Sequence, residues 1–257
     1  MNTTHTDQEA FSVEKFHAKY QDLVMKMHEQ AESEGTIFLP NMEPKKPADF
    51  IFICMEPSIG GWARTIEEGK IKVDAGFRNF TSSIEDFILH FCVQQYLCKT
   101  SQTYHFTDVS KGAMTIELAN VDRIKRYKKW HELLLMEMDL VAAPDAKIFA
   151  VGSAVADYLK KSNEESRFSF PFKQIIHYSS QAGKARADRI VGQEKDFEKF
   201  KGSVTLDNLL QASERVFDST PTMEKFRQST RDSIKKRKLS ESRQKLIYIY
   251  KRDFESV

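Results

Sequence analysis

Apolar and polar positions along the chain form blocks that predict helices and strands in turn. Residues 11–31 carry apolar side chains at helical spacing and precede a glycine, which predicts an N-terminal helix. A continuous apolar run at residues 50–55 is typical of a strand buried on both faces of a sheet. Similar runs recur at residues 104–107, 146–151 and 173–176.

Helical patterns lie between these runs, at residues 82–97, 123–141 and 153–161. The alternation of strand and helix predicts an α/β fold of three layers, α/β/α, with a central four-stranded, mostly parallel sheet and helices on both faces. In such folds the functional residues gather beyond the carboxyl ends of the strands.

The chain after Ile190 lacks this strand signal. Helical patterns run toward the C-terminus, with Thr205 and Ser219 as candidate N-caps. Residues 239–250 are compatible with a helix or a strand, because their apolar part is short and β-prone. We divide the chain into an N-terminal helix and lead-in, an α/β core, and a helical, basic C-terminal extension packed on that core, at residues 1–47, 48–190 and 191–257.

The composition fits one domain with appendages, because 257 residues with 40% hydrophobic side chains can bury a substantial core. The net charge of +2 does not by itself indicate a nucleic-acid-binding protein. Basic residues nevertheless predominate at residues 225–252. This segment is a candidate phosphate-contacting surface or, equally, a solvated helix face.

Cysteine spacing and hydropathy indicate the compartment. The three cysteines, Cys54, Cys92 and Cys98, have no CxxC spacing and lie in apolar segments, which indicates reduced, buried thiols rather than disulfides or a metal site. The sequence contains no run of about 18 uncharged apolar residues, and residues 1–14 lack an apolar signal segment. We expect a cytoplasmic protein with no membrane partner.

Polar residues directly follow three of the predicted strands. Glu56 comes after the first strand, Asp108 after the second and His177 after the last. Because the carboxyl ends of parallel strands meet at one edge of a sheet, these residues predict a site at that edge.

Four segments, in order, resemble motifs of the uracil-DNA glycosylase superfamily. Residues 52–58 are similar to its first motif, and residues 106–111 to its Ile-Thr-Asn-Val-Val-Lys segment. Residues 146–159 are similar to its strand, glycine turn and helix, and residues 176–179 to its His-Pro-Ser motif. The resemblance covers residues 48–190 and implies a uracil-DNA glycosylase-like fold and a monofunctional glycosylase that acts on double-stranded DNA as a monomer.

The resemblance assigns catalytic roles to Glu56 and His177. Cleavage of an N-glycosidic bond gives the sugar oxocarbenium character, which a carboxylate near C1′ stabilises while it orients water. The departing base carries negative charge, which a histidine donor stabilises. Glu56 is one methylene longer than the usual Asp, and Tyr178 replaces the usual proline. Without the resemblance, Glu56 is equally well interpreted as a helix cap or as the partner of a lysine. His177 is then more simply interpreted as a structural residue.

The resemblance also supplies candidates for holding a flipped nucleotide. Phe80 lies at the family's distance before the helix at residues 82–97 and would stack on the base. Phe77 is the alternative, and either can be a core residue. The remaining candidates are Met55 and Asp108 for the base, and Ser58, Lys111, Ser179 and Ser180 for the DNA backbone.

Asp108 stands where uracil-reading members have Asn. An ionised carboxylate has no donor for O4 of uracil but accepts well from the N4 amino group of cytosine. We therefore predict a preference for a modified cytosine, with Asp108 as a turn residue or helix cap as the alternative reading.

Excision of normal cytosine would destroy the host genome, so the expected target is a hypermodified cytosine foreign to the cell. The resemblance leans toward phage-defence glycosylases that attack bases such as glucosylated hydroxymethylcytosine in viral DNA. Trp62 is available to stack on such a sugar. The segment that carries it is equally well interpreted as a flexible surface loop with no role in binding.

Two other functions stay open. One is a base-excision repair glycosylase for uracil or another damaged base. The other is a non-catalytic DNA-binding protein with a vestigial pocket, because both the first motif, with Glu56, and the second motif, with His177, depart from the family pattern.

An iron–sulfur cluster needs four cysteine ligands and the chain has three, so we expect no cofactor.

Overall fold

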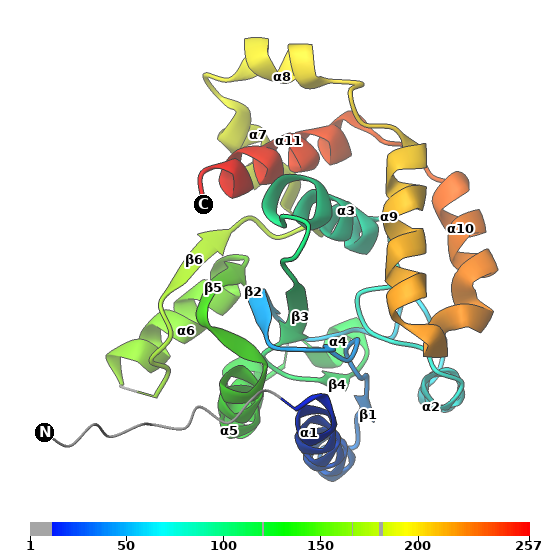
Figure 1. The fold of residues 1–257 in the computed structure, drawn as a ribbon, viewed down its shortest axis with the longest axis vertical. Helices are drawn as coiled ribbons and strands as arrows, with labels where there is room; N and C mark the ends of the chain where they lie inside the picture. Colours follow the sequence, from blue (N-terminus) through cyan, green and yellow to red (C-terminus); the bar gives the residue numbers. More distant parts are fainter. Residues whose placement is uncertain (1–11, 120, 166, 180–181) are drawn as a thin grey trace, which may run out of the picture.

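A four-stranded, fully parallel sheet forms the centre of the molecule (Figure 1). The computed structural model describes residues 12–119, 121–165, 167–179 and 182–257. All four predicted strands form, and their order across the sheet is β3-β2-β5-β6. Their bounds are Ala48–Cys54 for β2, Tyr104–Asp108 for β3, Ala142–Val151 for β5 and Phe172–Ile175 for β6.

The apolar run of β2 serves both faces of the sheet because successive side chains point to opposite sides. Phe50 and Phe52 join one hydrophobic cluster, whereas Ile51 and Ile53 join another. Helices cover both faces, which gives three layers (Figure 1). The first face carries α3 (Ile84–Cys92) and α11 (Glu241–Glu255), and the second carries α1 (Val13–Ser33), α5 (Arg123–Val141) and α6 (Ser153–Glu164).

The predicted helix at residues 82–97 forms in two parts. Ser83 caps α3 with a capping box, and the helix then continues as the π-helix η1 (Val93–Leu97). Shorter elements complete the chain. They are β1 (Ile37–Phe38), which pairs with β4 (Gly112–Ala113), and α2 (Ile66–Asp74), α4 (Ile116–Ala119), α7 (Gly183–Ile190), α8 (Glu194–Phe200), α9 (Leu206–Ser219), η3 (Pro221–Phe226) and α10 (Arg227–Lys235).

Three sequence-based expectations for the C-terminal third are settled. Thr205 is the N-cap of α9, as predicted. The prediction for Ser219 is wrong, because this residue ends α9 and its hydroxyl donates back to the carbonyl of Val216. Residues 239–250, left open between helix and strand, contribute to helix α11.

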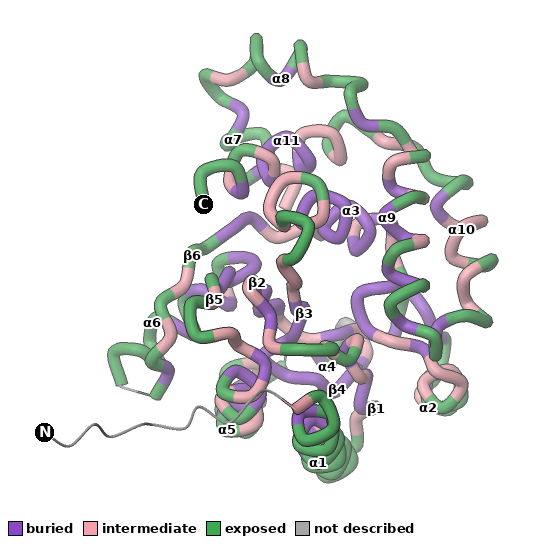
Figure 2. The backbone as a smooth tube through the Cα atoms, viewed as in Figure 1, coloured by how far each residue is buried: buried purple, intermediate pink, exposed green. Residues whose placement is uncertain are grey.

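Helix α11 belongs to the core of the molecule rather than to its surface. Five consecutive residues, 246–250, are buried, as expected for a helix with neighbours on all sides. Phe254 packs its ring against Phe52 and Phe149 of the sheet. The Tyr250 hydroxyl donates to the carbonyl of Ile176 at 2.8 Å, so α11 holds the chain immediately before His177. Figure 2 shows this burial, in contrast to the largely exposed α8.

The connections on either side of the neighbouring strands β2 and β5 lie on opposite faces of the sheet. The chain passes from β2 to β3 by way of α3 on one face, and from β5 to β6 by way of α6 on the other. Neighbouring strands β2 and β5 are therefore followed by helices on opposite faces, and ligands of open α/β sheets bind outside the carboxyl ends of such strands. None of the helices in the described ranges has the length and apolar character that a membrane span needs.

Candidate functional site

The carboxyl edge of the sheet brings the predicted catalytic and base-reading residues into one neighbourhood. Cys54 at the end of β2 pairs with Asp108 at the end of β3, and Glu56 follows two residues after Cys54. The charge of Glu56 contributes to the raised pKa of Asp108. Arg123, which pairs with Glu56, also helps to lower the pKa of His177. Arg123 is therefore near both Glu56 and His177, and Glu56 is near Asp108.

Both carboxylate oxygens of Glu56 are bound by the start of α5. Arg123 Nε donates to Oε1 at 2.9 Å, and the Tyr127 hydroxyl donates to Oε2 at 2.6 Å. The Arg126 guanidinium lies 3.9 Å from Oε1, and the Glu56 side chain is only 3% exposed. Burial, and then the charge of Glu56, raise the pKa of Tyr127, so this hydroxyl remains a donor. Among the described residues, Glu56 thus pairs with two arginines and a tyrosine rather than with a lysine.

His177 is arranged as a neutral hydrogen-bond donor. Burial, and then the charges of Arg186 and Arg123, lower its pKa to about 4, so the imidazole is neutral near pH 7. The backbone N–H of Ser179 donates to Nδ1 at 2.9 Å. Because Nδ1 accepts this bond, the ring proton resides on Nε2, which is left to donate elsewhere.

Two neighbours fix the plane of the His177 ring. Tyr178 stacks on it, with ring centroids 4.8 Å apart and planes within 12°. On another side lies Gly152, the residue between β5 and α6, whose φ is +93°. A Cβ at Gly152 would come within 3.1 Å of His177 side-chain atoms, so a glycine lets this turn approach the imidazole closely.

Arg186 holds the loop that carries His177. Its guanidinium donates to the carbonyl of Tyr178 at 2.5 Å and to the carbonyl of Ser179. It also donates to the Ser242 hydroxyl of α11 at 3.1 Å. Sequence reasoning missed Arg186, because nothing in the pattern of α7 distinguishes a buried arginine from a surface one.

Asp108 is buried and predominantly protonated at neutral pH. Burial raises its pKa to about 8, although the charge of Lys111 and a hydrogen bond from Asn79 oppose the shift. Asn79 Nδ2 donates to Oδ2 of Asp108 at 2.5 Å. A protonated carboxyl both donates and accepts, whereas the sequence-based argument for cytosine assumed an acceptor alone.

A buried polar network lies behind Asp108. Asn79 also donates to Asn41 at 3.3 Å, and Asn41 in turn donates to Thr107 at 3.1 Å. Glu137 of α5 is the centre of the network and accepts hydrogen bonds from His105 and Thr107 at 2.9 and 2.7 Å. The network fixes Asn79 and, through it, the Asp108 carboxyl.

Lys111 is part of that network and does not reach the surface. Its side chain is fully buried, with Nζ 2.7 Å from Glu137 and 2.6 Å from the Asp108 carbonyl. Burial acts to raise the pKa of Glu137, but Lys111 and His105 outweigh it and lower that pKa to about 2. The expected contact of Lys111 with the DNA backbone is corrected: this motif position holds a core ion pair.

The two candidate stacking residues lie in different environments. Phe80 follows Asn79, which accepts its backbone N–H at 2.9 Å, and packs on Phe106 with centroids 5.4 Å apart. Its φ of 61° is in the left-handed region, which is uncommon for an aromatic residue and frequent at ligand sites. Phe77 instead stacks on Trp62, with centroids 4.9 Å apart. Both rings are buried in hydrophobic clusters, and Phe80 is the one whose neighbour, Asn79, contacts Asp108.

Trp62 is largely covered in this structure. It is 8% exposed, with Phe77 on its ring and its indole N–H donating to the Ser58 carbonyl at 2.7 Å. Ser58 and Met55 are half-buried. Ser179 is also half-buried, and its backbone serves His177 and Arg186. Ser180, the remaining candidate, lies outside the described residues.

Local ion pairs neutralise much of the basic C-terminal segment. Arg227 pairs with Glu214, Asp218 and Glu224, and Arg243 pairs with Glu85. Residues 235–238 are four consecutive exposed cations.

The described part of the chain contains no group of three or more His, Cys, Asp or Glu side chains that could hold a metal ion. Comparisons of the chain with protein-family models, curated proteins and solved structures gave no match.

Proposed function

We propose that this chain is a monofunctional DNA glycosylase of the uracil-DNA glycosylase type, which hydrolyses the N-glycosidic bond of a flipped-out base and leaves an abasic site. The observation that carries the proposal is the neutral His177 with its proton on Nε2, coupled through Arg123 to the buried Glu56 at the carboxyl edge of a parallel sheet. The order of the four motifs supports the same assignment.

His177 suits the stabilisation of a departing base. The base leaves with negative charge on its O2 edge, and a preorganised N–H donor lowers the energy of that charge. A neutral imidazole donates from Nε2 while Ser179 occupies Nδ1. Tyr178 and Gly152 keep the ring in place, so little reorganisation is needed when the charge develops.

Glu56 supplies negative charge on the sugar side of the reaction. An oxocarbenium-like sugar is stabilised by a nearby carboxylate, which can also orient the attacking water. Arg123 is 28% exposed and is the more accessible of the two close donors to Glu56. A DNA phosphate that attracts Arg123 would free one Glu56 oxygen for water.

Asp108 would read the base, and its protonation state matters. Below its pKa of about 8, the carboxyl donates and accepts, and it matches N3 and N4 of cytosine or N3 and O4 of uracil. Above that pKa it only accepts, which suits the N4 amino group and repels O4. Cytosine derivatives are therefore compatible with both states. We propose a modified cytosine, such as glucosylated hydroxymethylcytosine in phage DNA, as the target.

Two observations favour other candidates. Because protonated Asp108 also matches uracil, a repair glycosylase for uracil or another damaged base is the second candidate enzyme. Because both oxygens of Glu56 are bound in the structure, a non-catalytic DNA-binding protein with a vestigial pocket is the third candidate.

Mass spectrometry of released bases separates these candidates. Duplexes containing uracil, hypoxanthine, hydroxymethylcytosine or its glucosylated form are incubated with the protein, and the free bases are quantified. Release of a cytosine derivative in excess over uracil is the expected result. Release of uracil alone would favour repair, and release of no base from duplexes that the protein binds would favour the binding protein.

A further inference from the structure

Four consecutive exposed cations lead from the end of α10 toward α11. They are Lys235, Lys236, Arg237 and Lys238, and we call residues 235–238 the basic turn. Like charges side by side repel one another, and none of the four forms an ion pair within the described ranges. The dipole of α10 favours a cation in its last turn, which accounts for Lys235, but the effect falls off beyond that turn.

The acids closest to the basic turn along the chain are engaged elsewhere. Asp232 accepts a hydrogen bond from Gln228 at 2.9 Å. The two carboxylate oxygens of Glu241 pair with Lys201 and Lys245 at 3.1 and 2.8 Å. The exposed positive charge is therefore a property of the folded chain and not only of its composition.

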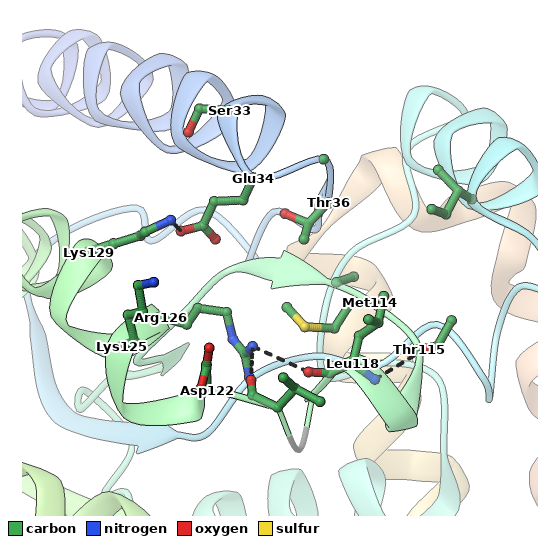
Figure 3. Close-up of a pocket in the computed structure, with 14 residues that line it drawn as sticks. Ser33, Glu34, Thr36, Met114, Thr115, Leu118, Asp122, Lys125, Arg126 and Lys129 are labelled. Carbon is green, nitrogen blue, oxygen red and sulfur yellow. Dashed lines mark hydrogen bonds and ion pairs between the residues drawn. The ribbon is translucent and has the colours of Figure 1, made fainter.

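The cations of another surface, the hollow of about 440 Å³ between α1 and the start of α5, are arranged differently (Figure 3). There Lys129 lies 3.6 Å from Glu34, and the Arg126 guanidinium donates to the carbonyls of Ala119 and Val121 at 2.6 and 3.1 Å. The protein's own oxygens hold those two cations, whereas the basic turn presents its charges to an external partner.

The backbone of the basic turn is anchored at both ends. Ile234, directly before it, is only 2% exposed, and Leu239, directly after it, packs against the hydrophobic cluster that contains α3 and α11. Arg243 also donates to the carbonyl of Lys238 at 2.7 Å. Binding of a partner would therefore order side chains rather than the backbone, which keeps its entropic cost small.

The start of α11 places the basic turn beside two parts of the candidate site. Nη2 of Arg243 donates at 2.8 Å to Glu85 in the first turn of α3, the helix that directly follows the segment with the candidate stacking residue. The hydroxyl of Ser242 accepts from Arg186 at 3.1 Å, and Arg186 holds the loop that carries His177. The basic turn is thus fixed at the border of this site.

We infer that the basic turn binds the phosphate backbone of duplex DNA that flanks the flipped nucleotide. Duplex DNA carries one negative charge per roughly 1.7 Å of its axis, so several phosphates come within reach of four adjacent cations. Such contacts position the duplex and carry no sequence information. This inference rests on the proposed glycosylase function and adds a surface that holds the substrate without taking part in the chemistry.

The first test measures affinity and does not depend on catalysis. Lys236→Glu, Lys238→Glu reverses two charges of the basic turn, and Lys19→Glu, Lys26→Glu on α1 is the matched control, because these lysines are exposed on the opposite side of the sheet. Binding of the full chain to an unmodified duplex is followed by fluorescence anisotropy at several salt concentrations. The site variant is expected to bind at least about tenfold more weakly, with a salt slope reduced by about 2, since each lost phosphate contact lowers the slope by about 1.

A neutral variant separates lost attraction from added repulsion. Lys236→Gln, Lys238→Gln removes the same two charges without introducing acids, and its salt slope is expected to fall by about 2 as well. Equal affinities of the site and control variants, or no binding of duplex by the wild type, would overturn the inference. Unchanged affinity for duplex with lost binding to vesicles of anionic phospholipid would also overturn it, because the basic turn would then serve a membrane surface.

The second test separates binding from chemistry. Base release is measured under single-turnover conditions over a range of protein concentrations. The half-saturating concentration of Lys236→Glu, Lys238→Glu should rise by the same factor as its dissociation constant, with the saturated rate within about twofold of wild type, as expected for the loss of uniform binding. A lower saturated rate at an unchanged half-saturating concentration would show that the basic turn supports the catalytic loop instead, and would overturn the inference.

The two tests distinguish failure of the inference from failure of the proposed function. If the wild type releases no base from any duplex, the proposed function fails, and a selective loss of affinity in the site variant still supports the basic turn as a DNA-binding surface. If base is released and the site variant binds duplex as the control does, the proposed function stands and the inference is overturned.

Discussion

The β3 side and the β6 side of the carboxyl edge are built differently. On the β3 side, Asp108 rests on a buried network centred on Glu137. On the β6 side, His177 lies on a half-buried loop whose backbone carbonyls accept hydrogen bonds from Arg186 and Tyr250. Burial shifts both pKa values, upward for Asp108 and downward for His177, and both shifts favour the neutral form. Under the proposed function, base reading would depend on the core, whereas bond cleavage would depend on a loop.

The largest expected effect is on stability, on the β3 side. Glu137→Ala leaves the fully buried Lys111 without its carboxylate partner. Loss of one member of a buried pair costs about 3–5 kcal/mol, and urea denaturation should show a decrease of this size in the free energy of unfolding. The double variant Glu137→Gln, Lys111→Met should recover part of it. A loss below about 1 kcal/mol would show that the network does not support this side.

The next effect is on catalysis, on the β6 side. His177→Gln should slow base release by about 10²–10³-fold, the usual cost of removing one donor to a developing anion, with little change in the free energy of unfolding. Single-turnover kinetics measures it, with His28→Gln on the exposed face of α1 as the control. A loss of less than about threefold would remove His177 from the chemistry.

Acid should loosen the His177 loop, because a protonated Nδ1 can no longer accept from the Ser179 N–H. The folded-state pKa of His177, about 4, lies below its ordinary value of about 6.5, so the unfolded chain binds the extra proton first. The contribution of neutral His177 to stability is therefore present above about pH 6.5 and is lost as the pH falls toward 4. Base release should decline over the lower part of the same window, and His177→Gln should lack this decline.

A smaller effect concerns base choice. The ratio of uracil to cytosine-derivative release should fall as the pH rises through about 8, because Asp108 then loses its donor. Asp108→Asn should abolish this dependence and favour uracil, with a change in discrimination of about 1–3 kcal/mol. Release of both bases is measured from pH 6 to 9. A ratio that stays constant in the wild type would contradict the role of Asp108.

The same titration affects stability in a defined direction. The folded-state pKa of Asp108 is above its unfolded value of about 3.9, so the folded chain retains a proton that the unfolded chain loses. Wild-type stability should therefore decrease from about pH 3.9 toward 8 relative to Asp108→Asn, and the difference should stay constant above that range.

The smallest effect tests how α11 supports the β6 side. Tyr250→Phe removes the hydrogen bond to the Ile176 carbonyl and leaves a buried acceptor unpaired. The free energy of unfolding should fall by about 1 kcal/mol, measured by urea denaturation, and base release should fall only slightly. Tyr248→Phe, on the same helix, is the control. A smaller effect of Tyr250→Phe than of Tyr248→Phe would contradict this support.

The sheet could be predicted from the sequence because buried strands need continuous apolar runs, and residues 50–55 form one. Helix α11 could not be distinguished from a strand, since residues 246–250 are buried on all sides and show no periodicity. Motif positions identified Glu56 and His177 but not their partners. Asn79, Arg123 and Arg186 reach the site through tertiary packing, which a single sequence does not reveal.

Lys111 shows the limit of motif reasoning most clearly. Its position resembles a family lysine, yet the sequence does not show that Glu137, 26 residues later, lies 2.7 Å from it in the core. Asp108 is similar, because its identity suggested an ionised acceptor, and only burial reveals a raised pKa.

The most direct test of the central claim is the comparison of wild type with Glu56→Gln on DNA containing glucosylated hydroxymethylcytosine. Abasic sites are quantified under single-turnover conditions, and duplex affinity is measured in parallel, with the exposed Glu67→Gln as the control. The account predicts abasic sites with wild type and Glu67→Gln, and at least about a 10²-fold loss with Glu56→Gln at unchanged affinity. Equal rates of abasic-site formation by wild type and Glu56→Gln would contradict it.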